Sequence, residues 1–164
     1  MDSTHVVFVV DQSGSMGGGS IGETELDTAV KSVIEAVSKL PKGARVNVIF
    51  FETNIHVWAK KLVKMNKQSF ATLKKYLLRR QPRGSTNLYD ALELALKYKD
   101  VDTIYVLSDG SPNMGKFTSS RDIRREIRKI NEFKRVVIHA VAVGYNSALL
   151  KALAAENGGR YVQK

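Results

Sequence analysis

The stretch that decides the fold is residues 5–15, which read HVVFVVDQSGS. Its five consecutive apolar residues are typical of a central parallel strand that is buried on both faces. A polar Asp-x-Ser-x-Ser pattern follows at Asp11, Ser13 and Ser15, and a glycine-rich turn occupies residues 14–22. We therefore expect a buried strand that carries oxygen-bearing side chains at its carboxyl end.

Outward from this strand, strand-like and helix-like patterns alternate along the chain. Apolar runs predict further strands at 45–52, 55–59, 103–107, 136–143 and 160–163. Apolar stripes at helical spacing predict helices at 24–40, 67–80, 87–98, 120–133 and 147–156. Thr24 is the expected N-cap of the first helix, because Asp27 stands three residues later. The alternation implies an α/β fold with an open, mostly parallel sheet and helices on both faces.

Three polar loops are expected to meet at one edge of this sheet. The loop after the first strand carries the Asp-x-Ser-x-Ser pattern, a loop before the third helix carries Thr86, and the loop after the next long buried strand carries Asp109. If those two strands are neighbours, the loops converge where ligands bind in open α/β sheets. Met16, Tyr89 and Asn113 lie in or beside these loops. They are candidates either for the rim that a partner touches or for packing.

The convergent set holds two carboxylates and three hydroxyls, which indicates a hard cation. Two carboxylates held close repel each other unless one is protonated or a cation lies between them. Oxygen ligands without His or Cys favour Mg²⁺ first, with Mn²⁺ or Ca²⁺ as alternatives. Because hydroxyl ligands donate little charge, such an ion would attract a further oxygen ligand from outside, ideally a carboxylate. The chemistry indicated is the capture of an acidic side chain rather than bond cleavage.

This set of residues resembles the metal-ion-dependent adhesion site (MIDAS) of von Willebrand factor type A (vWA) domains. The resemblance extends from about residue 5 to residue 162 and includes Ser-Asp-Gly after the fourth long strand and Gly-Gly-Arg-Tyr near the end. It implies that Ser13 and Ser15 bind the metal directly, and that Thr86 binds it directly or through water. It also implies that Asp11 and Asp109 act mainly through bound waters.

The resemblance carries expectations about fold and function. It implies one Rossmann-like, doubly wound domain over residues 1–164, with a six-stranded sheet of order 3-2-1-4-5-6 whose third strand is antiparallel. The family mostly mediates protein–protein contacts, many of them through a Glu or Asp of the partner, so the resemblance implies metal-dependent adhesion and no enzymatic activity. The family commonly carries a further helix after the last strand, and this sequence ends at Lys164 without one.

Simpler interpretations of the same residues stay open from sequence alone. Ser13 and Ser15 are common turn residues, and Thr86 would serve as the N-cap of the helix at 87–98. Asp109 would likewise fit an ordinary turn, since Gly110 follows it.

Two enzyme-like interpretations fit less well. The glycine run at 17–22 matches the dinucleotide fingerprint G-x-G-x-x-G, with Glu52 after the second strand, but that fingerprint should begin at the end of the first strand. A phosphatase similar to the haloacid dehalogenases, with Asp11 as nucleophile, needs a second Asp as general acid where Ser13 stands. The dinucleotide interpretation also leaves Thr86 and Asp109 unexplained.

The charge pattern supplies a second functional hypothesis. The chain holds 26 Lys and Arg against 16 Asp and Glu, a formal net charge of +10. Segment 60–83, which we name the basic stripe, contains no acidic residue and nine basic ones: Lys60, Lys61, Lys64, Lys67, Lys74, Lys75, Arg79, Arg80 and Arg83. This stripe is a candidate surface for nucleic acid or an anionic surface, although a solvated helix face is the commoner explanation of such a run.

Cysteine usage and hydropathy limit the remaining classes. The chain has no cysteine, which excludes a disulfide framework, a thiolate metal site and a cysteine nucleophile. No apolar run is long enough for a signal peptide or a membrane span. These features favour a cytoplasmic location, and we expect the isolated domain to be monomeric.

Overall fold

The computed structural model describes residues 4–20 and 23–164 of the chain. The strands of its large sheet are β1 (His5–Asp11), β4 (Arg45–Phe51), β5 (Ile55–Val57), β6 (Val63–Lys64), β7 (Thr103–Ser108), β8 (Val137–Ala142) and β9 (Tyr161–Gln163). A small hairpin is formed by β2 (Gly19–Ser20) and β3 (Glu23–Thr24). The helices are α1 (Glu25–Ser38), α2 (Lys67–Leu78), α3 (Leu88–Lys97), α4 (Ser120–Lys134) and α5 (Ala148–Glu156), with a 3₁₀ turn η1 (Gly14–Gly17) after β1.

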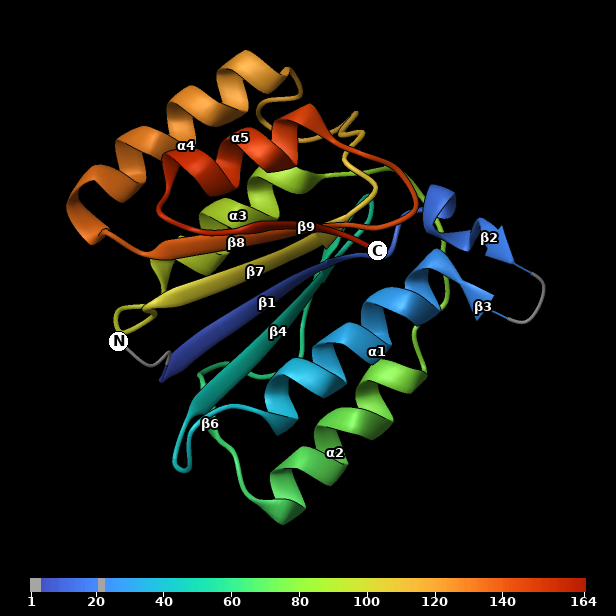
Figure 1. The fold of residues 1–164 in the computed structure, drawn as a ribbon, viewed down its shortest axis with the longest axis vertical. Coiled ribbons are helices and arrows are strands. Elements are labelled where there is room, and N and C mark those ends of the chain that lie inside the picture. Colours follow the sequence, from blue (N-terminus) through green and yellow to red (C-terminus); the bar gives the residue numbers. More distant parts are fainter. Residues whose placement is uncertain (1–3, 21–22) are drawn as a thin grey trace.

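The order of the strands is β5-β4-β1-β7-β8-β9, which confirms the expected order 3-2-1-4-5-6 (Figure 1). β1 pairs in parallel with β4 on one side and β7 on the other, and β8 and β9 continue the parallel arrangement. β5 runs antiparallel to β4, as predicted for the third strand. Three short strands were not expected. β6 pairs antiparallel with β4, and β2 and β3 form the small hairpin.

The predicted edge strand at 55–59 ends early, at Val57. A buried polar residue of β4, Asn47, explains the difference because its side chain replaces the regular ladder. Its Nδ2 donates to the carbonyl of Ala59 at 2.7 Å, and its Oδ1 accepts from the Ala59 amide at 3.1 Å. The chain then returns to β4 at Val63.

The helix starts follow from local capping. Thr24 Oγ1 accepts from the Asp27 amide at 3.1 Å, and the Asp27 carboxylate accepts from the Thr24 amide at 2.9 Å. This reciprocal capping box confirms the predicted N-cap of α1. Asn66 and Ser69 form the same arrangement at the start of α2. None of the helices in the described ranges is both long and apolar enough to cross a membrane.

β1 separates two apolar cores. Val7 and Val9 face the core under α3, α4 and α5, whereas Phe8 and Val10 face the core under α1 and α2 (Figure 1). All four side chains are almost completely buried, which confirms that β1 is a central strand buried on both faces. Each deeply buried apolar side chain of this size contributes on the order of 2 kcal/mol to the free energy of unfolding.

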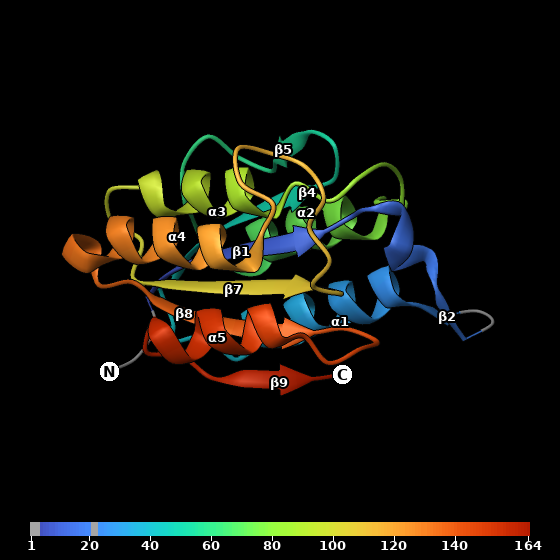
Figure 2. The ribbon, with the colours of Figure 1, turned by 90° about the horizontal axis from the view of Figure 1, so that it is seen from above.

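The register of β1 and β7 places the polar loops. The two strands are parallel neighbours, with Val10 opposite Leu107, and Figure 2 shows that they run in the same direction. The loops that follow Asp11 and Ser108 therefore leave the same edge of the sheet. This is the edge where open α/β sheets bind ligands.

Candidate metal site

Asp11 is the innermost residue of the candidate site, and it is fully buried at the end of β1. Its Oδ1 accepts from the Ser13 amide at 2.8 Å, and its Oδ2 accepts from the Ser108 hydroxyl at 2.7 Å. Burial raises the pKa of the Asp11 carboxyl to about 6, while the hydrogen bonds from Ser13 and Ser108 oppose that rise and the nearby Asp109 adds to it. A cation beside this carboxylate would relieve the cost of its burial.

The hydroxyls of Ser13 and Ser15 face each other, with 3.1 Å between their Oγ atoms. Ser13 is the N-cap residue of η1, yet its side chain makes no capping hydrogen bond there. Ser13 therefore borders a turn, as its residue type suggests, but its hydroxyl is not used to cap that turn. Ser13 and Ser15 are two positions apart, and their converging side chains present two hydroxyl oxygens to the same point.

Thr86 lies between the other two loops and is 4% exposed. Its amide donates to Asn113 Oδ1 at 2.8 Å, and its carbonyl accepts from the Asn113 amide at 3.0 Å. The N-cap of α3 is Asn87, whose side chain accepts from the Asp90 amide. The prediction that Thr86 caps this helix is therefore wrong, and its hydroxyl is not used for capping.

The Thr86 loop is also tied to the loop after β1. The Gly14 amide donates to the carbonyl of Gly84 at 2.9 Å, and the Arg83 amide donates to the carbonyl of Gln12 at 2.8 Å. Gly84 has a positive φ of 74°, a backbone conformation that favours glycine. These hydrogen bonds place Thr86 beside the Asp-x-Ser-x-Ser turn.

Sequence reasoning missed the acidic residue that anchors this loop. Glu52 is 3% exposed, and its Oε2 accepts from Arg83 Nε at 2.6 Å. Its Oε1 accepts from the Asn54 amide at 2.7 Å. In the sequence, Glu52 was visible only as an acidic residue at the end of an expected strand, where it was considered as part of a dinucleotide fingerprint. With both oxygens engaged by the protein, Glu52 is a loop anchor.

Asp109 follows β7 and is 9% exposed. Among the described residues, its carboxylate accepts one hydrogen bond, which is long, from the Ser111 amide at 3.4 Å, so the protein holds this carboxylate only weakly. Asp109 and Ser15 line the same cavity, of about 500 Å³, together with residues 145–149. The cavity gives both side chains access from outside.

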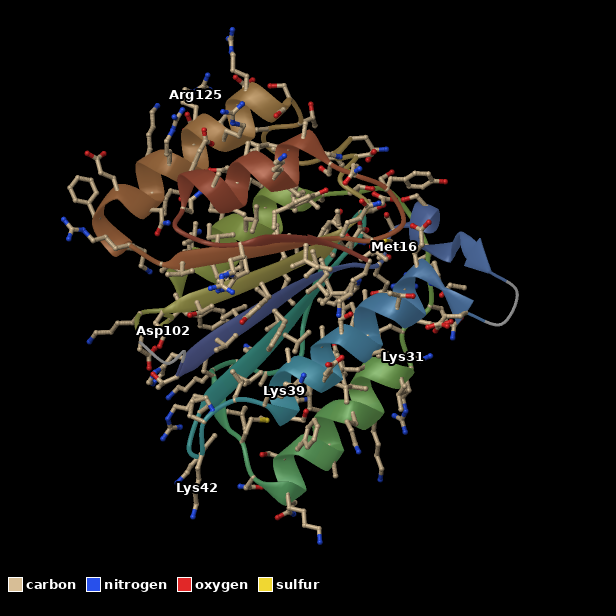
Figure 3. The ribbon with its side chains drawn as sticks, in the orientation of Figure 1. Met16, Lys31, Lys39, Lys42, Asp102 and Arg125 are labelled. Carbon is tan, nitrogen blue, oxygen red and sulfur yellow. The ribbon has the colours of Figure 1, made fainter. Side chains whose placement is uncertain are left out.

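Two residues expected as candidates for the partner-facing rim belong to the core. Met16, labelled in Figure 3, is completely buried in the core under α1 and α2. Tyr89 is 3% exposed and packs edge-on against Phe117, with ring centroids 4.8 Å apart. Both side chains therefore serve packing.

The donor set at this sheet edge consists mainly of hydroxyl groups. Across residues 4–20 and 23–164, no three His, Cys, Asp or Glu side chains gather closely enough to hold one ion. An ion at this edge would therefore depend on the hydroxyls of Ser13, Ser15 and Thr86 beside the two carboxylates. Oxygen donors of this kind suit Mg²⁺, Mn²⁺ or Ca²⁺. The residues at this edge therefore fit a divalent cation.

The fold is that of a mostly parallel, doubly wound vWA-type α/β domain. It superposes on a von Willebrand factor type A protein from Catenulispora acidiphila with a TM-score of 0.82 and 18% identity, covering 99% of this chain and 39% of that one. It superposes on a manganese-loaded TRAP protein from Plasmodium vivax with a TM-score of 0.71 and 15% identity, covering 99% of this chain and 68% of that one.

The sequence matches the family model described as the von Willebrand factor type A domain over residues 4–163, and the chain belongs to this family. Among curated proteins, it is 29% identical to human inter-alpha-trypsin inhibitor heavy chain H4 over 169 aligned residues, which cover 94% of this chain. It is 28% identical to human von Willebrand factor A domain-containing protein 3A, which covers 95% of this chain. The chain spans only 17% and 13% of the lengths of these relatives. These similarities do not support a cytoplasmic location.

Proposed function

We propose that this domain is a divalent-cation-dependent protein-interaction module that captures a Glu or Asp carboxylate of a partner protein. The observation that carries the proposal is the joining of three loops at one sheet edge, which gathers Asp11, Ser13 and Ser15 with Thr86 and Asp109. Family membership supports a role in protein interaction. The metal dependence and the acidic ligand rest on the donor set.

The roles of the residues follow from their contacts. Asp11 is held from both oxygens, so it would fix the position of water molecules around an ion and supply negative charge. Ser13 and Ser15 would offer their hydroxyls directly, and Thr86 would do so directly or through water. When bound, Mg²⁺ supplies positive charge and an exchangeable coordination position; Mn²⁺ or Ca²⁺ are the alternatives. Asp109, open to the cavity, would complete the set.

The same site supports a binding role rather than an enzymatic one. A metal-dependent phosphatase of the type considered above needs a proton donor two residues after Asp11, and Ser13 cannot transfer a proton near neutral pH. We therefore propose that the domain is not an enzyme. We also propose that its partner is a protein and that the isolated domain is monomeric.

Isothermal titration of the chelated protein with Mg²⁺ and with Mn²⁺ tests the site. We expect saturable binding of about one ion per chain. At about a hundredfold excess over Kd, bound Mg²⁺ should raise Tm by roughly 5 °C or more relative to EDTA, because ligand binding stabilises only the folded state. Absence of saturable binding, together with identical melting curves in EDTA and Mg²⁺, would contradict the proposal.

The pH dependence of Mg²⁺ binding provides a further prediction. Because burial raises the pKa of Asp11 to about 6, a proton competes with the cation below that pH. The affinity for Mg²⁺ should fall by up to about tenfold per pH unit below 6. The raised pKa makes the metal-free folded state bind the proton more tightly than the unfolded state, so this carboxyl adds stability as the pH falls from 6 towards 3.8. Calorimetric titrations with Mg²⁺ at pH 7.5, 6.0 and 5.0 measure the change in affinity. Equal affinities at all three pH values would contradict the prediction.

A second candidate function is binding of nucleic acid or another polyanion through the basic stripe. Seven of its residues are exposed and make no ion pair with any described residue: Lys60, Lys61, Lys64, Lys67, Lys74, Lys75 and Arg79. The other two are used internally. Arg83 pairs with Glu52, and the Arg80 guanidinium lies 4.5 Å from the centre of the Tyr76 ring.

A further inference from the structure

Glu25 is a buried acidic residue for which neither the fold nor the five-residue set accounts. It is the first residue of α1 and is only 8% exposed. Its Oε2 is buried and has no hydrogen-bond partner within the described structure. A buried carboxylate oxygen without a partner is costly, and a nearby cation would offset that cost.

The packing of two glycines locates the Glu25 carboxylate. A Cβ built on Gly144, in the loop after β8, would lie 2.5 Å from Glu25 Oε1. A Cβ built on Gly18 would lie 3.4 Å from the same Oε1 and 3.5 Å from the carbonyl oxygen of Ser15. The Glu25 amide also donates to the carbonyl of Gly18 at 2.7 Å. The carboxylate is therefore packed between the loop after β8 and the turn that carries Ser15.

The surroundings of this carboxylate are acidic. Burial raises the pKa of Glu25, and the negative charges of Asp109 and then Asp11 raise it further. One cation, Lys164, lines the same cavity of about 460 Å³, but its ammonium group donates to Ser32 Oγ at 3.1 Å. The Glu25 carboxylate therefore lies in the negative field of two other carboxylates, and among the described residues no cationic side chain donates a hydrogen bond to it.

We propose that Glu25 compensates the positive charge of a bound divalent cation without being one of its ligands. The inference rests on the proposed function. Glu25 does not form a metal-binding group with Asp11 and Asp109, so its effect is electrostatic. It makes the site bind a divalent cation more tightly, and it makes the metal-free domain less stable because a third buried carboxylate is then uncompensated.

Glu25→Gln tests this, because it removes the charge and keeps the shape of the side chain. We expect about tenfold weaker Mg²⁺ binding by titration calorimetry. In EDTA the variant should melt a few degrees above the wild type, because the repulsion between Glu25 and the other two carboxylates is removed. The matched control is Glu23→Gln, because Glu23 is exposed and pairs with Lys31, labelled in Figure 3. It should leave both measurements unchanged.

The outcomes separate this inference from the proposed function. If wild-type protein binds no Mg²⁺, the proposed function fails. If the wild type binds Mg²⁺ and Glu25→Gln binds it equally well, only the role of Glu25 fails. A purely structural role would lower Tm in EDTA as much as in Mg²⁺, and that result would also overturn the inference. If the Gln variant does not fold, Glu25→Met, which removes the charge without adding a donor, is measured in the same way.

Discussion

Asp109→Ala should abolish Mg²⁺ binding by this domain, lowering the affinity by at least about 100-fold. Asp109 shares a cavity with Ser15, and within the described part of the chain its carboxylate is held by one long hydrogen bond, from the Ser111 amide at 3.4 Å. Its removal therefore takes away half of the carboxylate charge of the five-residue set while leaving Asp11 buried and hydrogen-bonded. Titration calorimetry of the chelated variant is the measurement.

The unfolding temperature of Asp109→Ala provides a check on this prediction. In EDTA, Asp109→Ala should unfold at or slightly above the wild-type temperature, because one of two repelling carboxylates is gone. In Mg²⁺ it should lose the stabilisation that the wild type gains. A variant that binds Mg²⁺ with wild-type affinity would remove Asp109 from the site.

The basic stripe supplies the matched control. Reversal of Lys74, Lys75 and Arg79 to Glu changes exposed side chains that make no ion pair with the described residues. Mg²⁺ binding should be unaffected by this triple substitution. If the stripe binds a polyanion, that binding should fall in the triple variant, fall steeply with salt, and persist in Asp109→Ala. Arg80 is left intact because it packs over Phe50 and Tyr76.

Gly159→Ala should cause the largest loss of stability, on the order of 3 kcal/mol or more, and lower Tm by roughly 6–12 °C. A Cβ at Gly159 would lie 1.8 Å from the carbonyl oxygen of Ile138 and 2.9 Å from the amide nitrogen of His139. Both atoms belong to the backbone of β8, so no side-chain rotation can relieve the overlap. The loop between α5 and β9 would have to move away from the sheet.

The neighbouring glycine separates this steric effect from backbone strain. Gly158 has a positive φ of 73°, and a Cβ built on it meets nothing within 4 Å. Gly158→Ala should therefore cost only about 1 kcal/mol, from the left-handed backbone conformation. Chemical unfolding of both variants measures the difference. Equal losses would show that the contact with β8 is not the cause.

Much of the fold was predictable because the signals are local. The apolar run of β1 predicts a strand buried on both faces, and Thr24 with Asp27 predicts the start of α1; the structure confirms both. The strand order is also confirmed, but it was implied by the resemblance to vWA domains and not by a local signal. The early end of the edge strand was not predictable, because it depends on a side-chain contact between Asn47 and Ala59 in different segments.

The candidate site was likewise predictable only in part. The types of donor at Asp11, Ser13 and Ser15 are visible in the sequence, as are Thr86 and Asp109, and their assignment as metal ligands stays a prediction. What the sequence could not supply is how the loops are held together. Asn113 binds the Thr86 backbone from 27 positions away, and this contact exists only once the sheet has formed.

By itself, the sequence determined the periodicity of the strands and helices, the capping of α1 and the oxygen donors of the Asp-x-Ser-x-Ser pattern, because each depends on residues within a few positions of one another. The tertiary structure alone decided that Glu52 anchors a loop, that Arg80 packs over an aromatic ring, and that Glu25 Oε2 is buried without a hydrogen-bond partner among the described residues. Burial, and the electrostatic cost that comes with it, depends on which distant segments exclude water from a side chain. That quantity is set only when the chain has folded.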